Sequence, residues 1–421
     1  SATDDSSYKF GSVGNIYSGY LRAADTQVVL AIWQRAYRTI FKANYFLENI
    51  GRVEMDQTIK DEWIAEVKFL RAYEYFYMSL LYGGVPLITN VMTIEEANTQ
   101  TRNSRTEVVD FAIQELTAAA ADLPASRPEN EKGRIVKAAS LGIKGRLLMI
   151  DEKWAEAIAV YEEIIGLQVH EIDPRYKTIF EEAGEGSSEI ILSTNCIAGL
   201  YGNTHNQRNH HPEFYGGYSE VNPYQGMVDA FLMNDGLPIE DSPLYDPENP
   251  FDNRDPRLYA SIFLPEYTEF RGRLFLAHPD RASNNIAALP GATGYGWKKY
   301  VTEDYAGDFG NSMVTETDPA KLTEILRRER RVEFCIERTI RYMDIRRWGI
   351  FEEVMNKQFY GMKLTDDPAN YTDYSVETSG PMSGHYKVID KTGSITADME
   401  LIPIPLSEID INPALEQNPG Y

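Results

Sequence analysis

Apolar side chains recur at steps of three and four residues through the first 165 positions of this 421-residue chain. From Trp33 to Ile50 they line one wide face, which ends at Gly51. A second face of the same kind runs from Asp61 to Tyr82 and ends at the pair Gly83–Gly84. This spacing is typical of an amphipathic α-helix that packs along one side against a core. The first part of the chain is therefore constrained to fold as stacked helices.

Three further helices are predicted in this part of the chain: Arg105 to Leu123, Lys137 to Ile150, and Lys153 to Ile165. The connector between the last two is about three residues long, which forces an antiparallel pair. This pair resembles one tetratricopeptide repeat, with the small residue Gly145 at a position where two helices approach closely.

The character of the sequence changes after Pro174. Glycine, proline, asparagine, aspartate and tyrosine are dense as far as Tyr305, and the apolar runs between them are short. This composition predicts long structured loops with a few short strands. Near the end of the chain, Leu401 to Leu406 is predicted to be extended, because two prolines spaced by one residue cannot join a helix.

We therefore expect an all-α fold of tetratricopeptide-like helical hairpins with a large loop-rich insertion that contains a few short strands. The chain is predicted to be a single domain over residues 1–421. Within it, residues 1–170 form the helical repeat part and residues 171–320 the loop-rich, ligand-facing part. Residues 321–421 supply a closing helix and the extended C-terminal segment.

The segment from Leu322 to Trp348 is rich in arginine, but acidic and apolar residues are interleaved with the basic ones. Arg341 follows Glu337 by four residues and precedes Asp344 by three. On one continuous helix these residues share a face, so we expect forked contacts between the guanidinium group and the carboxylates. A basic patch for nucleic acid would lack the interleaved acids.

Composition excludes several classes of function. A formal net charge of -23 opposes binding to phosphate backbones and anionic lipids. The two cysteines provide neither a disulfide framework nor a thiolate metal cluster. There is no apolar run of about 18 residues for a membrane span. The sequence also lacks a G-x-S-x-G elbow, a P-loop and an H-E-x-x-H motif, so we expect that the protein is not an enzyme.

Five separated stretches carry a resemblance that spans nearly the whole chain. They are WQRAYRTIFKANYFLENI, EVKFLRAYEYFYMSLLYGGVPLIT, GRIVKAASLGIKGRLLMIDEKWAEAIAVYEEII, NPYQGMVDAFLMNDG with FDNRDPRLYASIF, and the arginine-rich segment followed by LIPIPLSEIDINPAL. In this order they closely resemble the RagB/SusD family, the nutrient-binding outer-membrane lipoproteins of Bacteroidetes.

The resemblance implies a function and a location. It implies a non-catalytic protein that binds an oligosaccharide or polysaccharide and delivers it to a SusC/RagA-like TonB-dependent transporter. It also implies attachment to the outer leaflet of the outer membrane, facing the exterior, through an N-terminal lipid anchor that this sequence does not include. The alternative is a tetratricopeptide-type scaffold that binds a protein or peptide.

A glycan receptor needs aromatic planes flanked by side chains that donate and accept hydrogen bonds. The densest such group lies between Cys196 and Tyr224, in a glycine-containing loop. The predicted ligand-binding residues of this loop are Tyr201, Asn203, His205, Asn206, Arg208, Asn209, Tyr215 and Tyr218. The competing interpretation is a polar loop folded on itself, with aromatic residues that only anchor it.

Two other segments are candidates for ligand contact. Tyr295 and Trp297 lie among small and basic neighbours, either as a stacking platform or as structural residues of a strand. Tyr20 and Arg22 belong to an aromatic N-terminal stretch.

Metal binding has little support in the sequence. The spacing of His205, His210 and His211 fits no zinc pattern. Asp241 to Asp255 lacks the glycine and terminal glutamate of a calcium loop. We therefore expect no metal and no cofactor, with calcium as the one alternative.

Overall fold

The computed structural model describes residues 3–8, 21–194, 219–277, 293–301, 316–337, 339–364, 366–371, 375–388 and 394–421. The chain forms two compact units. The helical unit consists of Leu21–Ile172, Ser188–Asn195 and Thr396–Tyr421. The mixed unit consists of Ser1–Tyr20, Asp173–Ser187 and Cys196–Ile395.

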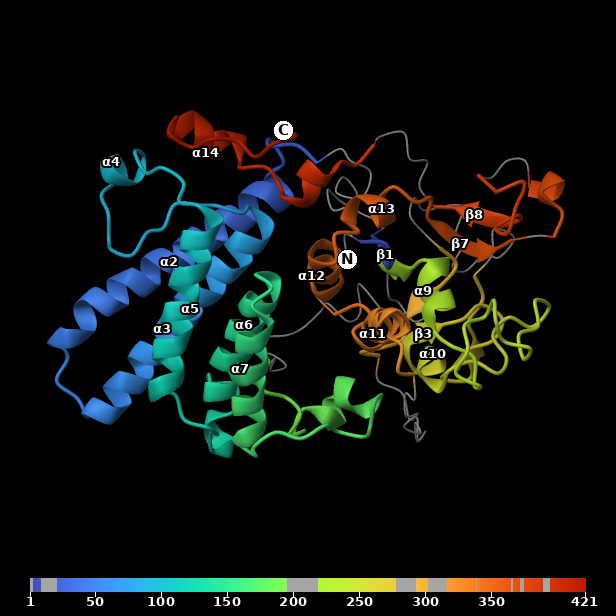
Figure 1. Cartoon of the computed structure of the whole chain (residues 1–421), viewed down its shortest axis with the longest axis horizontal. Helices are drawn as coiled ribbons and strands as arrows, with labels where there is room; N and C mark the ends of the chain where they lie inside the picture. Colours follow the sequence, from blue (N-terminus) through green and yellow to red (C-terminus); the bar gives the residue numbers. More distant parts are fainter. Residues whose placement is uncertain are drawn as a thin grey trace. The chain divides into compact units, whose positions relative to one another are not determined.

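Long helices that pack in chain order build the helical unit (Figure 1). They are α2 (Ala31–Asn49), α3 (Gln57–Leu81), α5 (Arg105–Asp122), α6 (Lys137–Ile150) and α7 (Trp154–Gly166). Short helical turns lie between or before them: η1 (Thr26–Leu30), η2 (Ile50–Arg52), α4 (Ile94–Ala97) and η3 (Glu129–Glu131). All five predicted helices are thus confirmed to within a few residues at their ends.

Local sequence explains where these helices begin and how closely they pack. The Asp56 carboxylate accepts a hydrogen bond from Ile59 N at 3.1 Å at the start of α3, and Ser104 with Glu107 forms a capping box at the start of α5. At Gly145 in α6, a Cβ atom would lie 2.6 Å from the ring of Tyr161 in α7. The predicted close approach at Gly145 is therefore confirmed.

A buried arginine ties three parts of the helical unit together. From α3, Arg71 Nε donates to Glu115 Oε2 of α5 at 2.9 Å, and its Nη1 donates to Asn44 Oδ1 of α2 at 2.7 Å. The Asn44 amide in turn donates to the carbonyl oxygens of Ile88 and Asn90, at 3.1 and 3.0 Å. These contacts hold the extended segment after α3 against the helices.

The C-terminal segment completes the helical unit at the end of α3. It contains η9 (Ala397–Glu400) and α14 (Leu406–Ile411), separated by an extended stretch, so the predicted extended segment ends one residue earlier than expected. Ile402 N donates to Leu81 O at 2.8 Å. The Asn418 amide donates to Tyr82 O at 3.0 Å and accepts from Arg102 Nη2 at 2.7 Å.

Short helices and paired strands make up the mixed unit. The strand pairs in the described part of this unit are antiparallel: β1 (Ser6–Tyr8) with β2 (Val221–Pro223), β3 (Ile262–Phe263) with β6 (Gly296–Trp297), β4 (Glu269–Phe270) with β5 (Arg273–Leu274), and β7 (Tyr360–Lys363) with β8 (His385–Lys387). Its helices and turns are η4 (Thr178–Phe180), η5 (Glu182–Gly184), α9 (Gln225–Ala230), α10 (Pro256–Ser261), α11 (Pro319–Glu333), α12 (Ile340–Arg347), α13 (Phe351–Met355) and η8 (Pro368–Tyr371).

Among the described residues, the core of the mixed unit includes two buried clusters. One surrounds Trp297 and includes Phe231, Leu258 and Cys335. The other surrounds Phe263 and Phe270 of β3 and β4. The predicted fold class, helical hairpins with a loop-rich part that contains short strands, is thus confirmed. Among the described residues, none of the helices combines the length and the apolar character that a membrane span requires.

Candidate functional site

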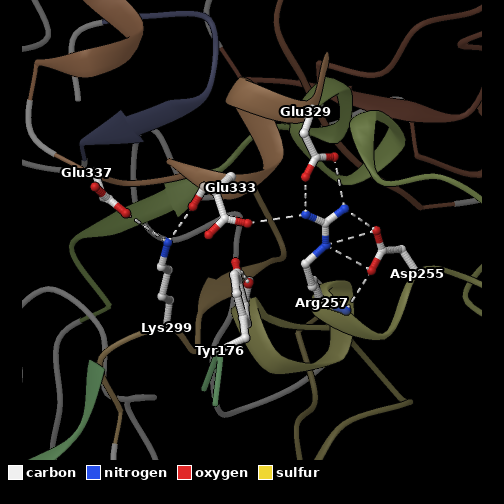
Figure 2. Close-up of polar contacts among 8 residues, drawn as sticks. Tyr176, Asp255, Arg257, Lys299, Glu329, Glu333 and Glu337 are labelled. Carbon is white, nitrogen blue, oxygen red and sulfur yellow. Dashed lines mark hydrogen bonds and ion pairs between the residues drawn. The ribbon is translucent and has the colours of Figure 1, made fainter. Parts of the chain in front are cut away.

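A charged network in the mixed unit surrounds Arg257 of α10 (Figure 2). The Arg257 guanidinium donates to Asp255 Oδ2 at 2.7 Å, to Glu329 Oε1 at 2.6 Å and to Glu333 Oε2 at 3.2 Å. Asp255 caps the start of α10, whereas Glu329 and Glu333 come from α11 one helical turn apart. Burial raises the pKa of the Glu333 carboxyl, although Lys299 and Arg257 oppose this shift.

Lys299 extends this network into the core. Its ammonium group donates to Glu333 O at 2.7 Å and to Glu337 Oε1 at 3.1 Å (Figure 2). Lys299 is fully buried, and its Nζ lies 4.1 Å from the ring centroid of Phe180. The Lys299 ammonium group also lies 5.3 Å from the ring centroid of Tyr176, whose hydroxyl is 3.0 Å from that of Ser261. Protein groups thus occupy the donors of Arg257 and Lys299, so the network joins α10, α11 and the Asp173–Ser187 segment and has a structural role.

The arginine-rich segment departs from the prediction of one continuous helix. The chain turns between α11 and α12, and Ile336 and Thr339 both have a φ of 61°. Left-handed residues cannot continue an α-helix, so Arg341 does not share a helical face with Glu337. Instead, Arg341 Nε and Nη2 donate to the two carboxylate oxygens of Asp4 at 2.9 and 2.6 Å.

Neighbouring arginines hold the same N-terminal acids. Arg331 Nε donates to Asp5 Oδ1 at 2.6 Å. Within the arginine-rich segment itself, Asp344 accepts two hydrogen bonds from Arg330 at 3.0 Å each. Burial raises the pKa of Asp4, but the charges of Arg331 and Arg341 outweigh it and hold that pKa below its ordinary value. Asp4 and Asp5 belong to the N-terminal stretch considered for ligand contact, but their partners here are arginines 337 and 326 residues away.

Most of the predicted ligand-binding residues lie outside the described residues. These are Tyr20, Tyr201, Asn203, His205, Asn206, Arg208, Asn209, Tyr215 and Tyr218. Arg22 is described and is exposed at the start of the helical unit, where its carbonyl accepts a hydrogen bond from Asp25 N at 2.9 Å.

The structure corrects the prediction for Tyr295 and Trp297. Trp297 pairs with Ile262 across β3 and β6, and its indole is fully enclosed by the core cluster. Tyr295 is also buried, and its hydroxyl donates to Gln225 Oε1 at 2.5 Å. A ring without an accessible face cannot stack on a ligand, so both residues are structural, which was the second interpretation of this segment.

Tyr295 nevertheless begins a chain of aromatic rings that leads to the surface. Its ring centroid lies 6.3 Å from that of Phe251, and Phe251 lies 5.8 Å from Tyr267, both in edge-to-face contact. Tyr267 stacks on Tyr259 at 5.5 Å. Sequence analysis missed Tyr267, because no motif distinguishes it from the many other tyrosines of the chain.

The described residues offer no group of three or more His, Cys, Asp and Glu side chains that could hold a metal ion. In the stretch considered for calcium, the Asp246 carboxylate instead accepts from Glu248 N at 3.0 Å and from the Asn249 amide at 2.8 Å. This is the local hydrogen bonding of a turn. The three histidines considered for zinc lie outside the described residues.

Two family models match this chain. One is described as the SusD family and matches residues 178–319 and 306–421. The other is described as starch-binding associating with outer membrane and matches residues 2–149. The chain belongs to the SusD family.

Solved structures of SusD-like proteins agree with this assignment. A SusD-like carbohydrate-binding protein of Bacteroides fragilis is 28% identical to this chain with a TM-score of 0.87, and the match covers 98% of this chain and 91% of that one. A second SusD-like protein of Bacteroides fragilis is 26% identical with a TM-score of 0.81, over 100% and 92% of the two chains.

A curated relative gives a shorter match. A SusD-like protein of Formosa agariphila is 28% identical over 171 residues, which are 40% of this chain and 32% of that protein. The matched region thus spans about a third of the curated relative. Taken together, the comparisons place this SusD-family chain in a carbohydrate-binding family that associates with the outer membrane.

Proposed function

We propose that this protein binds an oligosaccharide or polysaccharide at the cell surface and delivers it to a SusC-like TonB-dependent transporter without chemical change. The observation that carries the proposal is the match to the Bacteroides fragilis carbohydrate-binding protein, which extends over 98% of this chain at 28% identity. Similarity over this length supports a shared kind of ligand as well as a shared fold.

Charge supports a glycan over other ligands. The formal net charge of -23 disfavours nucleic acids and anionic lipids, whereas an uncharged glycan is not repelled. The charged clusters around Arg257, Lys299 and Arg341 are engaged by protein carboxylates, so we assign them to structure and place the ligand elsewhere. We infer that the protein is not an enzyme and that its function requires no cofactor.

The partner and the location are part of the same proposal. We infer attachment to the outer leaflet of the outer membrane through an N-terminal lipid anchor, with the protein facing the exterior. The helical unit exposes large apolar side chains at helical spacing on α7, namely Trp154, Ile158 and Ile165. Exposed apolar rows of this kind are typical of protein-interaction surfaces, and they support a transporter partner for the helical unit.

Binding measurements separate this proposal from a peptide-binding scaffold. Affinity electrophoresis and calorimetry of the full chain against a panel of polysaccharides should reveal at least one bound glycan. A reducing-end assay on the same mixtures should detect no cleavage. Failure to bind any glycan, together with binding of a peptide or protein, would support the scaffold function, and release of reducing ends would identify a hydrolase.

A further inference from the structure

One exposed tyrosine of the mixed unit is supported in an unusual way. The side chain of Tyr267 is 44% exposed, yet its ring is stacked on Tyr259 with the two planes 18° apart. The stack covers one face of the Tyr267 ring. Phe251 contacts the same ring at 70°, and the exposed area is the part of Tyr267 that these two rings leave uncovered.

The backbone around Tyr267 is held in a tight turn. Thr268 N donates to Leu264 O at 3.0 Å, and Leu264 N donates to Thr268 Oγ1 at 2.9 Å. The neighbouring Glu266 N donates to Phe275 O at 2.8 Å. These three bonds fix the turn from both sides, so Tyr267 does not depend on its own side-chain contacts for its position.

The rings beneath Tyr267 are also fixed. Tyr259 Oη donates to Phe251 O at 2.6 Å and accepts from Arg254 N at 3.1 Å. Phe251 contacts the buried Tyr295, and both Phe251 and Tyr259 pack on the core cluster around Trp297. An aromatic plane that is already ordered loses little entropy when a ligand binds, which favours affinity.

Exposed polar side chains of both charges lie near Tyr267 in the sequence, since Arg271 and Arg273 follow it in the next turn. Asp252, Asn253 and Glu266 are all exposed. Partial burial, then Tyr259 and the Asp252 carboxylate, raise the pKa of the Tyr267 hydroxyl, which therefore stays protonated. Carboxylates and amides accept hydrogen bonds from sugar hydroxyls, whereas the carboxylates repel the carboxylate or sulfate of an acidic sugar.

We propose that Tyr267 is a stacking platform for a neutral sugar ring of the bound glycan. This inference rests on the proposed function and adds a position and a ligand class to it. The apolar C–H face of a pyranose covers the exposed part of the Tyr267 ring, and its hydroxyls meet the side chains of Asp252 and Glu266. The net charge of -23 favours a neutral sugar over a uronic acid or sulfated sugar.

The test compares variants of the full chain in affinity gels and calorimetry. The neutral probes are amylopectin, laminarin, mannan and xylan, and the acidic probe is polygalacturonate. Tyr267→Ala removes the platform, and Tyr267→Phe retains the ring without the hydroxyl. Tyr45→Ala is the matched control, because it removes a tyrosine of α2 that is 57% exposed. Thermal unfolding verifies that each variant is folded.

We expect Tyr267→Ala to weaken binding of a neutral glycan by about three- to tenfold, the range of an aromatic stacking contact. Tyr267→Phe and Tyr45→Ala should remain close to the wild type. Equal affinity of Tyr267→Ala and wild type for a glycan that the wild type binds would overturn the platform and leave the proposed function intact. Tighter binding of polygalacturonate than of every neutral probe would overturn the neutral ligand class. A wild-type protein that binds no glycan would overturn the inference together with the proposed function.

Discussion

Arg341 of α12 and Asp4, near the start of the mixed unit, form a forked ion pair with N–O distances of 2.9 and 2.6 Å. Both side chains are largely buried. The pair connects positions 337 residues apart in the sequence, so it joins the N-terminal strand to the arginine-rich segment.

Replacement of Arg341 by alanine is expected to lower the free energy of unfolding by about 1.5–3 kcal/mol, the range for hydrogen bonds to a charged group. The loss arises because Asp4 and Asp5 would share fewer cationic partners in a buried site. Chemical denaturation measures the change. Arg328→Ala is the control, because its guanidinium is 36% exposed and lies 3.9 Å from Glu240. Equal stability of both variants and the wild type would contradict the structural role of the pair.

Replacement of Arg71 by alanine should destabilise the helical unit by about 3–5 kcal/mol, since it leaves the buried Glu115 carboxylate without its cation. Circular dichroism during urea titration measures the effect. Lys42→Ala, at an exposed position of α2, should change the stability by less than about 0.5 kcal/mol. A similar small change for both variants would show that Arg71 does not hold α2, α3 and α5 together.

Two glycines of α6 should respond in opposite ways to alanine. At Gly145 the new methyl group would lie 2.6 Å from Tyr161, so Gly145→Ala should cost about 1–3 kcal/mol through overpacking. At Gly142 nothing lies within 4 Å, and Gly142→Ala should stabilise the helix by about 0.5–1 kcal/mol. The thermal unfolding midpoints of the two variants, compared with that of the wild type, measure both changes in stability. Shifts of the same sign would contradict the close packing of α6 on α7.

His385 of β8 predicts a loss of stability in mild acid. Burial lowers its pKa below the ordinary value of 6.5. As the pH falls through about 6.5, the unfolded chain takes up a proton that the folded chain does not, so the free energy of unfolding decreases. Urea midpoints at about pH 7.5 and pH 5.5 should differ less for His385→Gln than for the wild type. An identical difference in both proteins would exclude His385 as the cause.

Chelation is expected to leave glycan binding unchanged, because we propose a function without a cofactor. The wild-type affinity for a bound polysaccharide should be the same with EDTA, and with calcium added back. A loss of affinity that calcium restores would overturn this part of the proposal and direct attention to residues that the described part of the chain does not include.

The helices could be predicted because their determinants are local. The apolar period of α2 and α3 and the glycines that follow them lie within a few turns of each other in the sequence. The break between α11 and α12 could not be predicted in this way. It is made by Ile336 and Thr339, and neither a glycine nor a proline marks it.

The site was harder to predict for a different reason. A tryptophan between small and basic neighbours has the same local sequence whether it packs in a core or faces a ligand. Trp297 is buried because β6 pairs with β3, whose residues come some 35 positions earlier, with Ile262 opposite Trp297. Tyr267 is exposed because it lies in a hydrogen-bonded turn, and the rings of Tyr259 and Phe251 pack against it there. Burial of this kind depends on tertiary contacts that a single sequence does not reveal.

The hydrogen bond between Arg102 and Asn418 joins residues 316 positions apart within the helical unit. The ribosome makes the five long helices early but supplies Asn418 only after the whole mixed unit has been synthesised. The end of α3 therefore lacks its contacts with the C-terminal segment until the last residues of the chain have been synthesised. During translation, chaperones and proteases would bind the incompletely folded nascent chain at this end of α3.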